Sequence, residues 1–246
     1  MLKNFKVVIE YDGTDFHGWQ RQKFHRTIQA EIEKAIATMT GQKITVVGSG
    51  RTDAGAHALG QVANFKCDTR LRSKEFLKGL NSLLPPSILI KACEQVGDNF
   101  HARYDAKSKL YQYRILNQAL PAAIMRQYAW HIRRPLDTKA IRLAAAHLIG
   151  EHDFKSFEGT GSPRTHTKRR VYTADIISQD LNYLVFEIEA DGFLRFMVRN
   201  IVGTLVEVGM GKISPEDFKK ILLSKDRSQA SATAPSQGLF LKAVKY

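Results

Sequence analysis

The spacing of hydrophobic residues changes along the first half of the chain and predicts an alternation of strands and helices. Apolar residues occupy every second position from Phe5 to Tyr11, at Phe5, Val7, Ile9 and Tyr11, which is typical of a strand with one buried face. After Thr27, a suitable helix N-cap, apolar residues recur every three or four positions as far as Met39, and Gly41 follows as a helix end. The other elements predicted here are strands at Ile44–Val47, Gln61–Lys66 and Ile88–Val96 and a helix at Ser73–Leu80. The resulting order is β-α-β-β-α-β.

The second half of the chain predicts a similar order. Its expected strands are Leu110–Leu116, Val171–Ser178, Tyr183–Ala190 and Leu239–Tyr246, and its expected helices begin after Asp137, at Phe196 and after Ser214. Both halves match the split βαβ, or ferredoxin-like, arrangement. We therefore predict an α+β protein of two tandem ferredoxin-like (β-α-β-β-α-β) halves, residues 1–105 and residues 106–246, whose antiparallel sheets flank a central cleft.

The balance of charge predicts a polyanionic partner. The chain has 37 Lys and Arg against 24 Asp and Glu, a formal net charge of +13 over 246 residues. Such a charge attracts nucleic acids, although a basic protein indifferent to RNA can have the same composition. The two isolated cysteines indicate neither a disulfide framework nor a zinc site. The charged N-terminus is unlike a signal peptide and no segment approaches the length of a membrane span, so a cytoplasmic protein is expected.

The segment from Gly48 to Gly60 is the most unusual part of the sequence. It contains four glycines and lies between two predicted strands, so a ligand can approach its backbone closely. Arg51 and Asp53 point to the same side of an extended segment, where the guanidinium favours the ionised carboxylate. That carboxylate can act as a nucleophile or base, or the two residues can form an ion pair that stabilises a turn. His57 is expected to be structural or solvated rather than catalytic.

Two known nucleotide-binding motifs are excluded for this segment. It lacks the Gly-Lys-Ser/Thr ending of a phosphate-binding loop and the third glycine of a dinucleotide fingerprint.

Two further segments have compositions that suit a nucleic acid. Residues 100–104, Phe-His-Ala-Arg-Tyr, mix aromatic rings that can stack on bases with a cation that can neutralise phosphate. The alternative for this segment is a connector between strands with a buried Phe. Residues 164–170 carry four fixed positive charges in seven positions. That run suits either a loop that contacts phosphates or a solvated charged loop.

The run Gly50-Arg51-Thr52-Asp53-Ala54-Gly55-Ala56-His57 closely resembles the catalytic signature of the tRNA pseudouridine synthase A family. Further blocks resemble the same family in the same order along nearly the whole chain. They are residues 10–13 (Glu-Tyr-Asp-Gly), 18–22 (Gly-Trp-Gln-Arg-Gln), 100–104, 110–114 (Leu-Tyr-Gln-Tyr-Arg), 153–157 (Asp-Phe-Lys-Ser-Phe), 197–203 (Met-Val-Arg-Asn-Ile-Val-Gly), 232–235 (Ala-Thr-Ala-Pro) and 238–241 (Gly-Leu-Phe-Leu). A single Arg-Thr-Asp would be a weak signal, whereas this ordered set is specific.

The resemblance implies a role for each matching residue. Asp53 would be the essential catalytic aspartate, Tyr111 the tyrosine that packs on the target uracil, and Arg51 the arginine that takes the place of the flipped base. Arg199 would be the basic group that pairs with Asp53. The residues that bind RNA and assist base flipping would be Phe100, His101, Ala102, Arg103 and Tyr104, together with Arg164, Thr165, Lys168 and Arg169 in a loop that touches the tRNA. Phe196 departs from the family pattern, which often has a polar aromatic residue or His there.

The resemblance also implies the reaction and its partners. The family isomerises uridine to pseudouridine at positions 38 to 40, in the anticodon stem-loop of tRNA. Its members are homodimers with the pseudouridine synthase fold, in which the cleft between the two halves is the active site. The reaction gains no atom and involves no redox change, so neither a cofactor nor a metal is expected. The aspartate can add either to C6 of the uracil or to C1′ of the ribose.

Two other classes of protein stay open as alternatives. A non-catalytic RNA-binding protein of the same fold would bind through its basic face and would need no ionised Asp53. A nucleotide-dependent RNA-modifying enzyme would require a phosphate-binding loop, which the sequence lacks.

Overall fold

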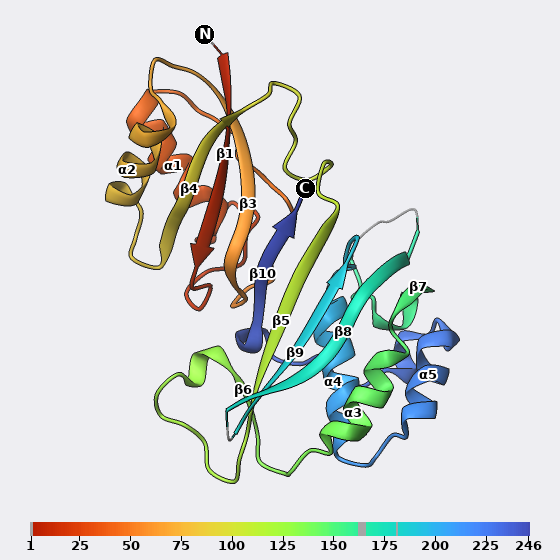
Figure 1. The fold of residues 1–246 in the computed structure, drawn as a ribbon. Coiled ribbons are helices and arrows are strands. Elements are labelled where there is room, and N and C mark those ends of the chain that lie inside the picture. Colours follow the sequence, from red (N-terminus) through yellow and green to blue (C-terminus); the bar gives the residue numbers. More distant parts are fainter. Residues whose placement is uncertain (1, 162–165, 181) are drawn as a thin grey trace. The chain divides into compact units, whose positions relative to one another are not determined.

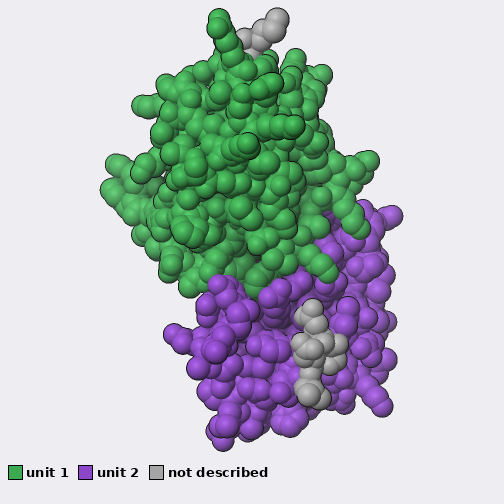
Figure 2. Space-filling view, turned by 60° about the vertical axis from the view of Figure 1, so that its left-hand side comes forward, with its two compact units in different colours: residues 1–107, 240–246 green, residues 108–239 purple. Residues whose placement is uncertain are grey.

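The alternating residues 5–11 lie in a strand whose apolar side chains are buried, as their period predicts. The fold is that of a computed structural model, which describes residues 2–161, 166–180 and 182–246. The chain divides into two compact units, unit 1 with residues 1–107 and 240–246 and unit 2 with residues 108–239 (Figure 2). Each unit combines a sheet with helices, which confirms the α+β class.

Unit 1 is a mainly antiparallel sheet with two helices on one face (Figure 1). Its elements are β1 (Leu2–Tyr11), α1 (Ile28–Thr40), β2 (Val47–Gly48), β3 (His57–Asp68), α2 (Ser73–Leu83), β4 (Ile88–Val96) and β10 (Leu239–Lys245). β1 pairs with β4 along one edge and with β3 along the other. β2 pairs with β3 in the antiparallel sense, and β10 is parallel to β3. The first six elements follow the predicted β-α-β-β-α-β order.

Local signals in the sequence account for α1 and for the core beneath the two helices. The hydroxyl of Thr27 accepts a hydrogen bond from the third backbone amide after it, and Gly41 ends the helix with a φ of 70°, in the left-handed region. The rings of Phe5, Phe65 and Phe76 come from β1, β3 and α2 and lie 4.7 to 5.5 Å apart between centroids. Each of these predicted elements therefore contributes its apolar face to one core.

The strand predicted at Ile44–Val47 is wrong in extent, because only β2, Val47–Gly48, pairs with a neighbouring strand. The backbone N–H of Val46 donates to the Glu33 carboxylate at 3.0 Å, and its carbonyl accepts from the Gln29 amide at 3.1 Å. These side chains from α1 occupy the backbone groups that a neighbouring strand would bond. Val46 therefore cannot pair with a neighbouring strand through these groups.

Unit 2 follows the same element order with insertions, except that its closing strand, β10, groups with unit 1. Its helices and strands are β5 (Ser108–Asn117), β6 (Trp130–Ile132), α3 (Thr138–Ala146), β7 (Gly150–Asp153), β8 (Lys168–Asp180), β9 (Tyr183–Ala190), α4 (Met197–Gly209) and α5 (Pro215–Ser224). Its described residues also form 3₁₀ turns at Arg126–Tyr128, Lys155–Phe157, Arg227–Gln229 and Ser236–Gly238. The strands pair in the antiparallel order β5-β9-β8-β7, β6 is parallel to β5, and α3, α4 and α5 gather beside the sheet (Figure 1). β6 and β7 were not predicted, because strands of three and four residues are too short to show a period.

The predicted helix caps of unit 2 are confirmed. Asp137 accepts hydrogen bonds from two backbone amides at the start of α3. Ser214 accepts from the amide of Asp217 at 3.1 Å, and Pro215 occupies the first position of α5. Among the described residues, no helix has the length and apolarity needed to cross a membrane.

The last strand, β10, does not group with the rest of the second half, although a division between residues 105 and 106 predicts that grouping. That division put all of residues 106–246 in one half, whereas residues 240–246 cluster with unit 1. In β10, Phe240 lies opposite His57 of β3, and the two rings stack with centroids 4.6 Å apart. The two residues lie in opposite halves of the sequence. The grouping therefore depends on a long-range pairing that periodicity does not reveal.

Candidate functional site

The Asp53 loop, residues 49–56, joins β2 to β3 and is supported by buried polar groups. Ser49 is fully buried and donates to the side-chain oxygen of Gln61 at 2.6 Å. The hydroxyls of Tyr11 and Thr52 share a hydrogen bond of 2.7 Å, and burial raises the pKa of the Tyr11 phenol, which keeps it neutral. Asp53 is half-exposed between these anchors. The loop backbone is therefore held from below while Asp53 stays partly exposed.

A second loop, residues 12–22, lies directly against the Asp53 loop. A Cβ on Gly13 would lie 1.9 Å from the carbonyl oxygen of Ala56, so only glycine permits this approach. Gly18 has a φ of 83°, and a Cβ there would lie 2.5 Å from the Thr52 oxygen. The same oxygen accepts a hydrogen bond from the backbone of the buried Trp19 at 3.2 Å. Gly13, Gly18 and Trp19 thus shape the Asp53 loop.

Arg51 is exposed and has a defined partner in this second loop. Its Nε donates to the side-chain oxygen of Gln20 at 3.0 Å. Gln20 belongs to the sequence block at 18–22, which by itself predicts no role for this residue. The structure adds Gln20 to the surroundings of Arg51.

His57 begins β3 and supports the loop from the inside. It is 1% exposed, and its Nδ1 accepts a hydrogen bond from the backbone N–H of Gly13 at 3.0 Å. These contacts agree with the structural role expected for His57.

Residues 100–104 form a turn with an exposed aromatic and cationic surface. The His101 and Tyr104 rings stack with centroids 4.2 Å apart, and the Arg103 guanidinium lies 5.7 Å from the Tyr104 centroid. Tyr104 is 74% exposed, whereas Phe100 is half-buried and Ala102 is fully buried. Arg103 and Tyr104 are therefore the most exposed side chains of the turn, and Phe100 and His101 are partly exposed. The side chain of Ala102 does not reach the surface.

Tyr111 lies on β5 in unit 2. It is 7% exposed, and its ring meets the ring of Phe193 edge-on, with centroids 4.8 Å apart and an interplanar angle of 77°. Tyr113, two residues along the strand, is fully buried, and its hydroxyl donates to the Pro235 carbonyl at 2.6 Å. The partner of the Tyr111 ring, Phe193, belongs to no motif that could have pointed to it in the sequence.

Arg199 lies in the first turn of α4, near Phe196, the residue that departs from the pattern of the resembled family. Its Nε donates to the Ala234 carbonyl at 2.7 Å. Phe196 caps the helix with a φ of 60°, and its ring centroid lies 4.7 Å from the Arg195 guanidinium and 5.0 Å from that of Arg199. An aromatic ring suits this position because it interacts favourably with both cations.

The basic run at 164–170 is only partly a loop. Arg164 and Thr165 lie outside the described residues. Lys168 and Arg169 belong to β8 and pair with β7, so the prediction that the strand begins at Val171 is wrong. The reason is that β7, which was not predicted, supplies a partner for these backbone groups. Lys168 is exposed, whereas Arg169 is half-buried, which lowers its pKa.

Two other observations bear on what the described residues can bind. No group of three or more His, Cys, Asp or Glu side chains in the described part of the chain is arranged to hold a metal ion. A cavity of about 620 Å³ in unit 2 lies at the start of α3, the end of α4 and the start of α5, and none of the predicted site residues lines it.

Comparison with known proteins relates the whole chain to one group. A sequence model of a family described as tRNA pseudouridine synthase matches residues 7–105 and 144–246. The tRNA pseudouridine synthase A of Thermoanaerobacter pseudethanolicus is 47% identical over 245 residues, covering 100% of both chains. The proteins of that name from Acetivibrio thermocellus and Moorella thermoacetica are 44% and 45% identical, with coverage of 100% and 98% of both chains. Among solved structures, a chain of the archaeal box H/ACA sRNP Nop10-Cbf5 complex is similar at 12% sequence identity. The match covers 82% of this chain and 44% of that chain. Its TM-score of 0.36 is too low to carry an argument.

Proposed function

Because this chain belongs to the tRNA pseudouridine synthase family, we propose that it is an isomerase that converts uridine to pseudouridine at positions 38 to 40, in the anticodon stem-loop of tRNA. One observation carries this proposal. The Gly50–His57 run forms a loop supported by buried groups, with a half-exposed carboxylate at Asp53. An accessible carboxylate on a rigid support is what nucleophilic attack on a bound uridine requires.

Pseudouridine formation exchanges one bond to the ribose for another. The N1–C1′ bond breaks, the uracil turns, and C5 joins C1′, while C5 loses its proton and N1 ends with one. In the proposed mechanism Asp53 is the nucleophile, and it adds to C6 of the uracil or to C1′ of the ribose. Both routes leave the composition of the RNA unchanged, so neither calls for a cofactor or a metal.

A target base stacked in a stem or loop has to leave the stack before it can react. We assign this step to Arg51, whose flat guanidinium takes the place of the flipped uracil. Tyr111 packs on the flipped uracil, and Arg199 is the basic group that pairs with Asp53. Tyr111 lies on a strand, which suits this role because strands hold a ring more rigidly than loops do.

The proposed tRNA contacts combine stacking with charge. Arg103 and Tyr104 present a cation and a ring to the RNA, in one segment with Phe100, His101 and Ala102. Arg164, Thr165, Lys168 and Arg169 are assigned to the phosphates. We also propose a homodimer that works on tRNA in the cytoplasm; sedimentation of the purified protein would give twice the mass of one chain.

The test is turnover without any added cofactor. The purified protein is incubated with a tRNA transcript that carries 5-tritiated uridine at positions 38 to 40. Because C5 loses its hydrogen in the reaction, we expect tritium release into water and pseudouridine in the digested RNA. A transcript with cytidine at those three positions and 5-tritiated uridine elsewhere is the matched control, and it should release no tritium.

The alternatives predict different results in the same assay. Binding of tRNA without tritium release would support a non-catalytic RNA-binding protein of this fold. Release that requires an added nucleotide would support a nucleotide-dependent enzyme. Either result would overturn the proposed function.

A further inference from the structure

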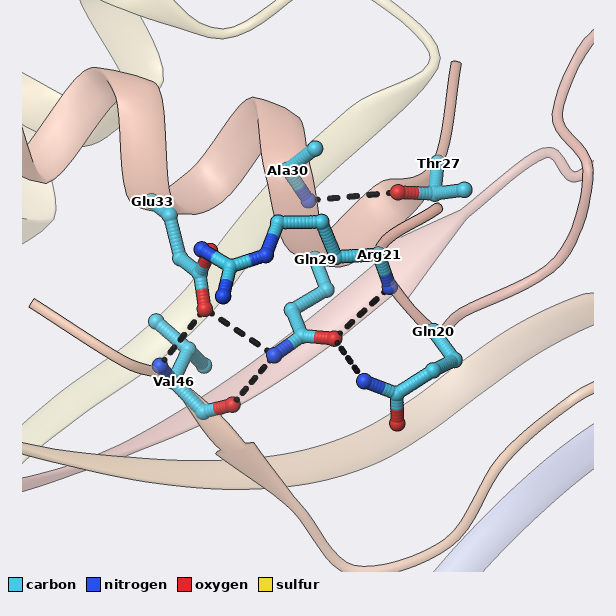
Figure 3. Close-up of polar contacts among 7 residues, drawn as sticks. All are labelled: Gln20, Arg21, Thr27, Gln29, Ala30, Glu33 and Val46. Atoms are coloured by element: carbon cyan, nitrogen blue, oxygen red, sulfur yellow. Dashed lines mark hydrogen bonds and ion pairs between the residues drawn. The ribbon is translucent and has the colours of Figure 1, made fainter. Parts of the chain in front are cut away.

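A chain of side-chain hydrogen bonds runs from helix α1 to the arginine proposed to assist base flipping. Most of it appears in Figure 3, where Gln29 and Glu33 on α1 face Gln20 and Arg21 on the neighbouring loop. Gln29 is 4% exposed and Glu33 is 7% exposed, so both are buried polar side chains in a helix that otherwise buries apolar residues. Buried polar groups are retained when each of them is satisfied.

Every hydrogen-bonding atom of the Gln29 amide group has a partner. Its oxygen accepts from Gln20 Nε2 at 2.9 Å and from the backbone N–H of Arg21 at 2.8 Å. Its nitrogen donates to Glu33 at 2.9 Å and to the Val46 carbonyl at 3.1 Å. Glu33 is held in turn, because its second oxygen accepts from Arg21 Nη1 at 2.7 Å.

These contacts fix which amide atom donates and which accepts in each of these hydrogen bonds. A backbone N–H can only donate, and a carbonyl or carboxylate oxygen accepts. The Gln29 oxygen must therefore face Arg21, and its nitrogen must face Glu33. Gln20 must then turn its nitrogen towards Gln29, which leaves its oxygen for the Nε–H of Arg51, 3.0 Å away. The reverse orientation of the Gln20 amide would place a donor against a donor at Arg51 and an acceptor against an acceptor at Gln29.

We propose that Gln20, oriented by Gln29 and Glu33, is a positioning residue that aligns the guanidinium of Arg51 for base flipping. The inference rests on the proposed function and adds to it a residue that acts through Arg51. An exposed arginine has many rotamers, and a stacking role requires one plane. A bond at Nε constrains that plane and leaves the two terminal nitrogens for RNA. Alignment before the substrate binds lowers the entropic cost of the flipped state.

The test replaces Gln20 with Met, which has a similar length and forms no such bonds. Gln22→Met is the matched control, because Gln22 is an exposed residue of the same loop whose amide donates to the His17 carbonyl at 3.0 Å, within the loop itself. We expect Gln20→Met to lower the single-turnover rate about tenfold, the loss expected for one hydrogen bond to a charged group. The Kd for tRNA should stay within about twofold, because Arg51 acts after docking. Gln22→Met should match the wild-type protein in both quantities.

The same substitution in an Arg51→Ala background separates a positioning role from an independent one. If Gln20 acts through Arg51, then Gln20→Met should change the rate less than about twofold once Arg51 is absent, because coupled residues are not additive. An equal loss in both backgrounds would overturn the proposal. So would a wild-type rate for Gln20→Met itself.

A readout that does not depend on activity distinguishes this inference from the proposed function. The Arg51 Nε–H resonance can be assigned in a ¹⁵N spectrum by its loss in Arg51→Lys. We expect that resonance to shift and to exchange faster with water in Gln20→Met and to stay unchanged in Gln22→Met. An unchanged resonance in Gln20→Met would overturn the inference. Absence of pseudouridine formation by the wild-type protein would instead overturn the proposed function.

Discussion

Asp53 differs in exposure from the residues on which its loop rests. Ser49, Thr52 and His57 are buried, whereas Asp53 is half-exposed. Asp53→Asn keeps the shape of the side chain and removes the anionic oxygen. We expect tritium release to fall by at least about a thousandfold, since the loss of an essential nucleophile costs several orders of magnitude. Filter binding should show nearly unchanged affinity for tRNA.

The control for this prediction is Asp15→Asn, which neutralises an exposed carboxylate in the neighbouring loop. It should retain wild-type turnover. Turnover of Asp53→Asn above about 1% of wild type would contradict a nucleophilic role.

Arg51→Lys tests the geometry of a cation rather than its charge. Lysine keeps the positive charge and loses both the flat guanidinium and the Nε–H that donates to Gln20. We expect near-normal tRNA affinity, a large drop in turnover, and partial rescue on a substrate whose target uridine is already unstacked. A fluorescent base analogue beside the target reports flipping directly. If the Lys variant flips the base at the wild-type rate and extent, the stacking role is wrong.

At the scale of an element, the turn at 100–104 depends on buried asparagines of the sheet. Asn64, 5% exposed on β3, donates to the Phe100 carbonyl at 3.3 Å and accepts from the backbone of Ala102 at 2.8 Å. Asn4 on β1 donates to the Phe100 carbonyl at 2.9 Å, and the Tyr246 hydroxyl donates to the Ala102 carbonyl at 2.7 Å. Side chains from distant parts of unit 1 thus replace the regular backbone bonds that the turn lacks.

Asn64→Ala should therefore destabilise the protein. It removes the acceptor of the buried Ala102 N–H and the Asn64 donor to the buried side-chain oxygen of Asn4, which we expect to lower the free energy of unfolding by about 2–3 kcal/mol. The corresponding fall in Tm is about 4–12 °C for a chain of this size. Thermal unfolding followed by circular dichroism measures it. The control is Asn99→Ala, which changes an exposed residue in the same segment between β4 and β5. Equal Tm values for the two variants would refute the anchoring role.

At the scale of the whole molecule, the charge of +13 implies that tRNA binding weakens as salt rises. Replacing Lys168, Arg169 and Arg170 with Ala should flatten the plot of log affinity against log salt by about 2 units, since each lost phosphate contact reduces the slope by somewhat less than one. Turnover at saturating tRNA should stay largely unchanged. Neutralising Lys74 and Lys78, exposed on α2, should alter the slope less. An unaltered slope for the first variant would show that this run does not meet the RNA backbone.

Thiol and phenol groups that folding wholly or partly removes from water predict a loss of stability in alkali. Burial raises the pKa of Cys93 to about 12 and raises the pKa values of Tyr11, Tyr113 and Tyr246. Each group binds its proton more tightly in the folded chain than in the unfolded one. Its contribution is therefore complete below the unfolded pKa and is lost as the pH rises towards the folded one. The free energy of unfolding should fall steadily above about pH 9, where free thiols and phenols begin to ionise.

Denaturant unfolding from about pH 8 to about pH 11 measures that decline, since this range spans the ordinary pKa values of thiols and phenols. Ultraviolet absorbance of tyrosinate supplies the second readout, because its formation at the buried rings should accompany unfolding. Full ionisation of all eight tyrosines before any loss of circular dichroism would contradict the prediction.

Part of this protein follows from its sequence alone. The strand at residues 5–11, the capped helix after Thr27 and the Ser214 cap of α5 depend on residues a few positions apart, and all three were predicted. The Asp53 loop was predicted as a candidate site because its glycines and its Arg-Thr-Asp run are contiguous. Local propensity and contiguous motifs act within one or two turns of the chain, so they can be read in order.

The tertiary structure decided what depends on distant partners. Gln29 and Glu33 are two polar residues four positions apart on a helix, and only their burial beside Gln20 connects them with Arg51. The same holds for Asn64, whose amide bonds a turn 36 residues away. The physical reason is common to these cases. A buried polar group must be satisfied, and its partner is whichever group the fold brings within hydrogen-bonding distance, at a sequence separation that no local pattern encodes.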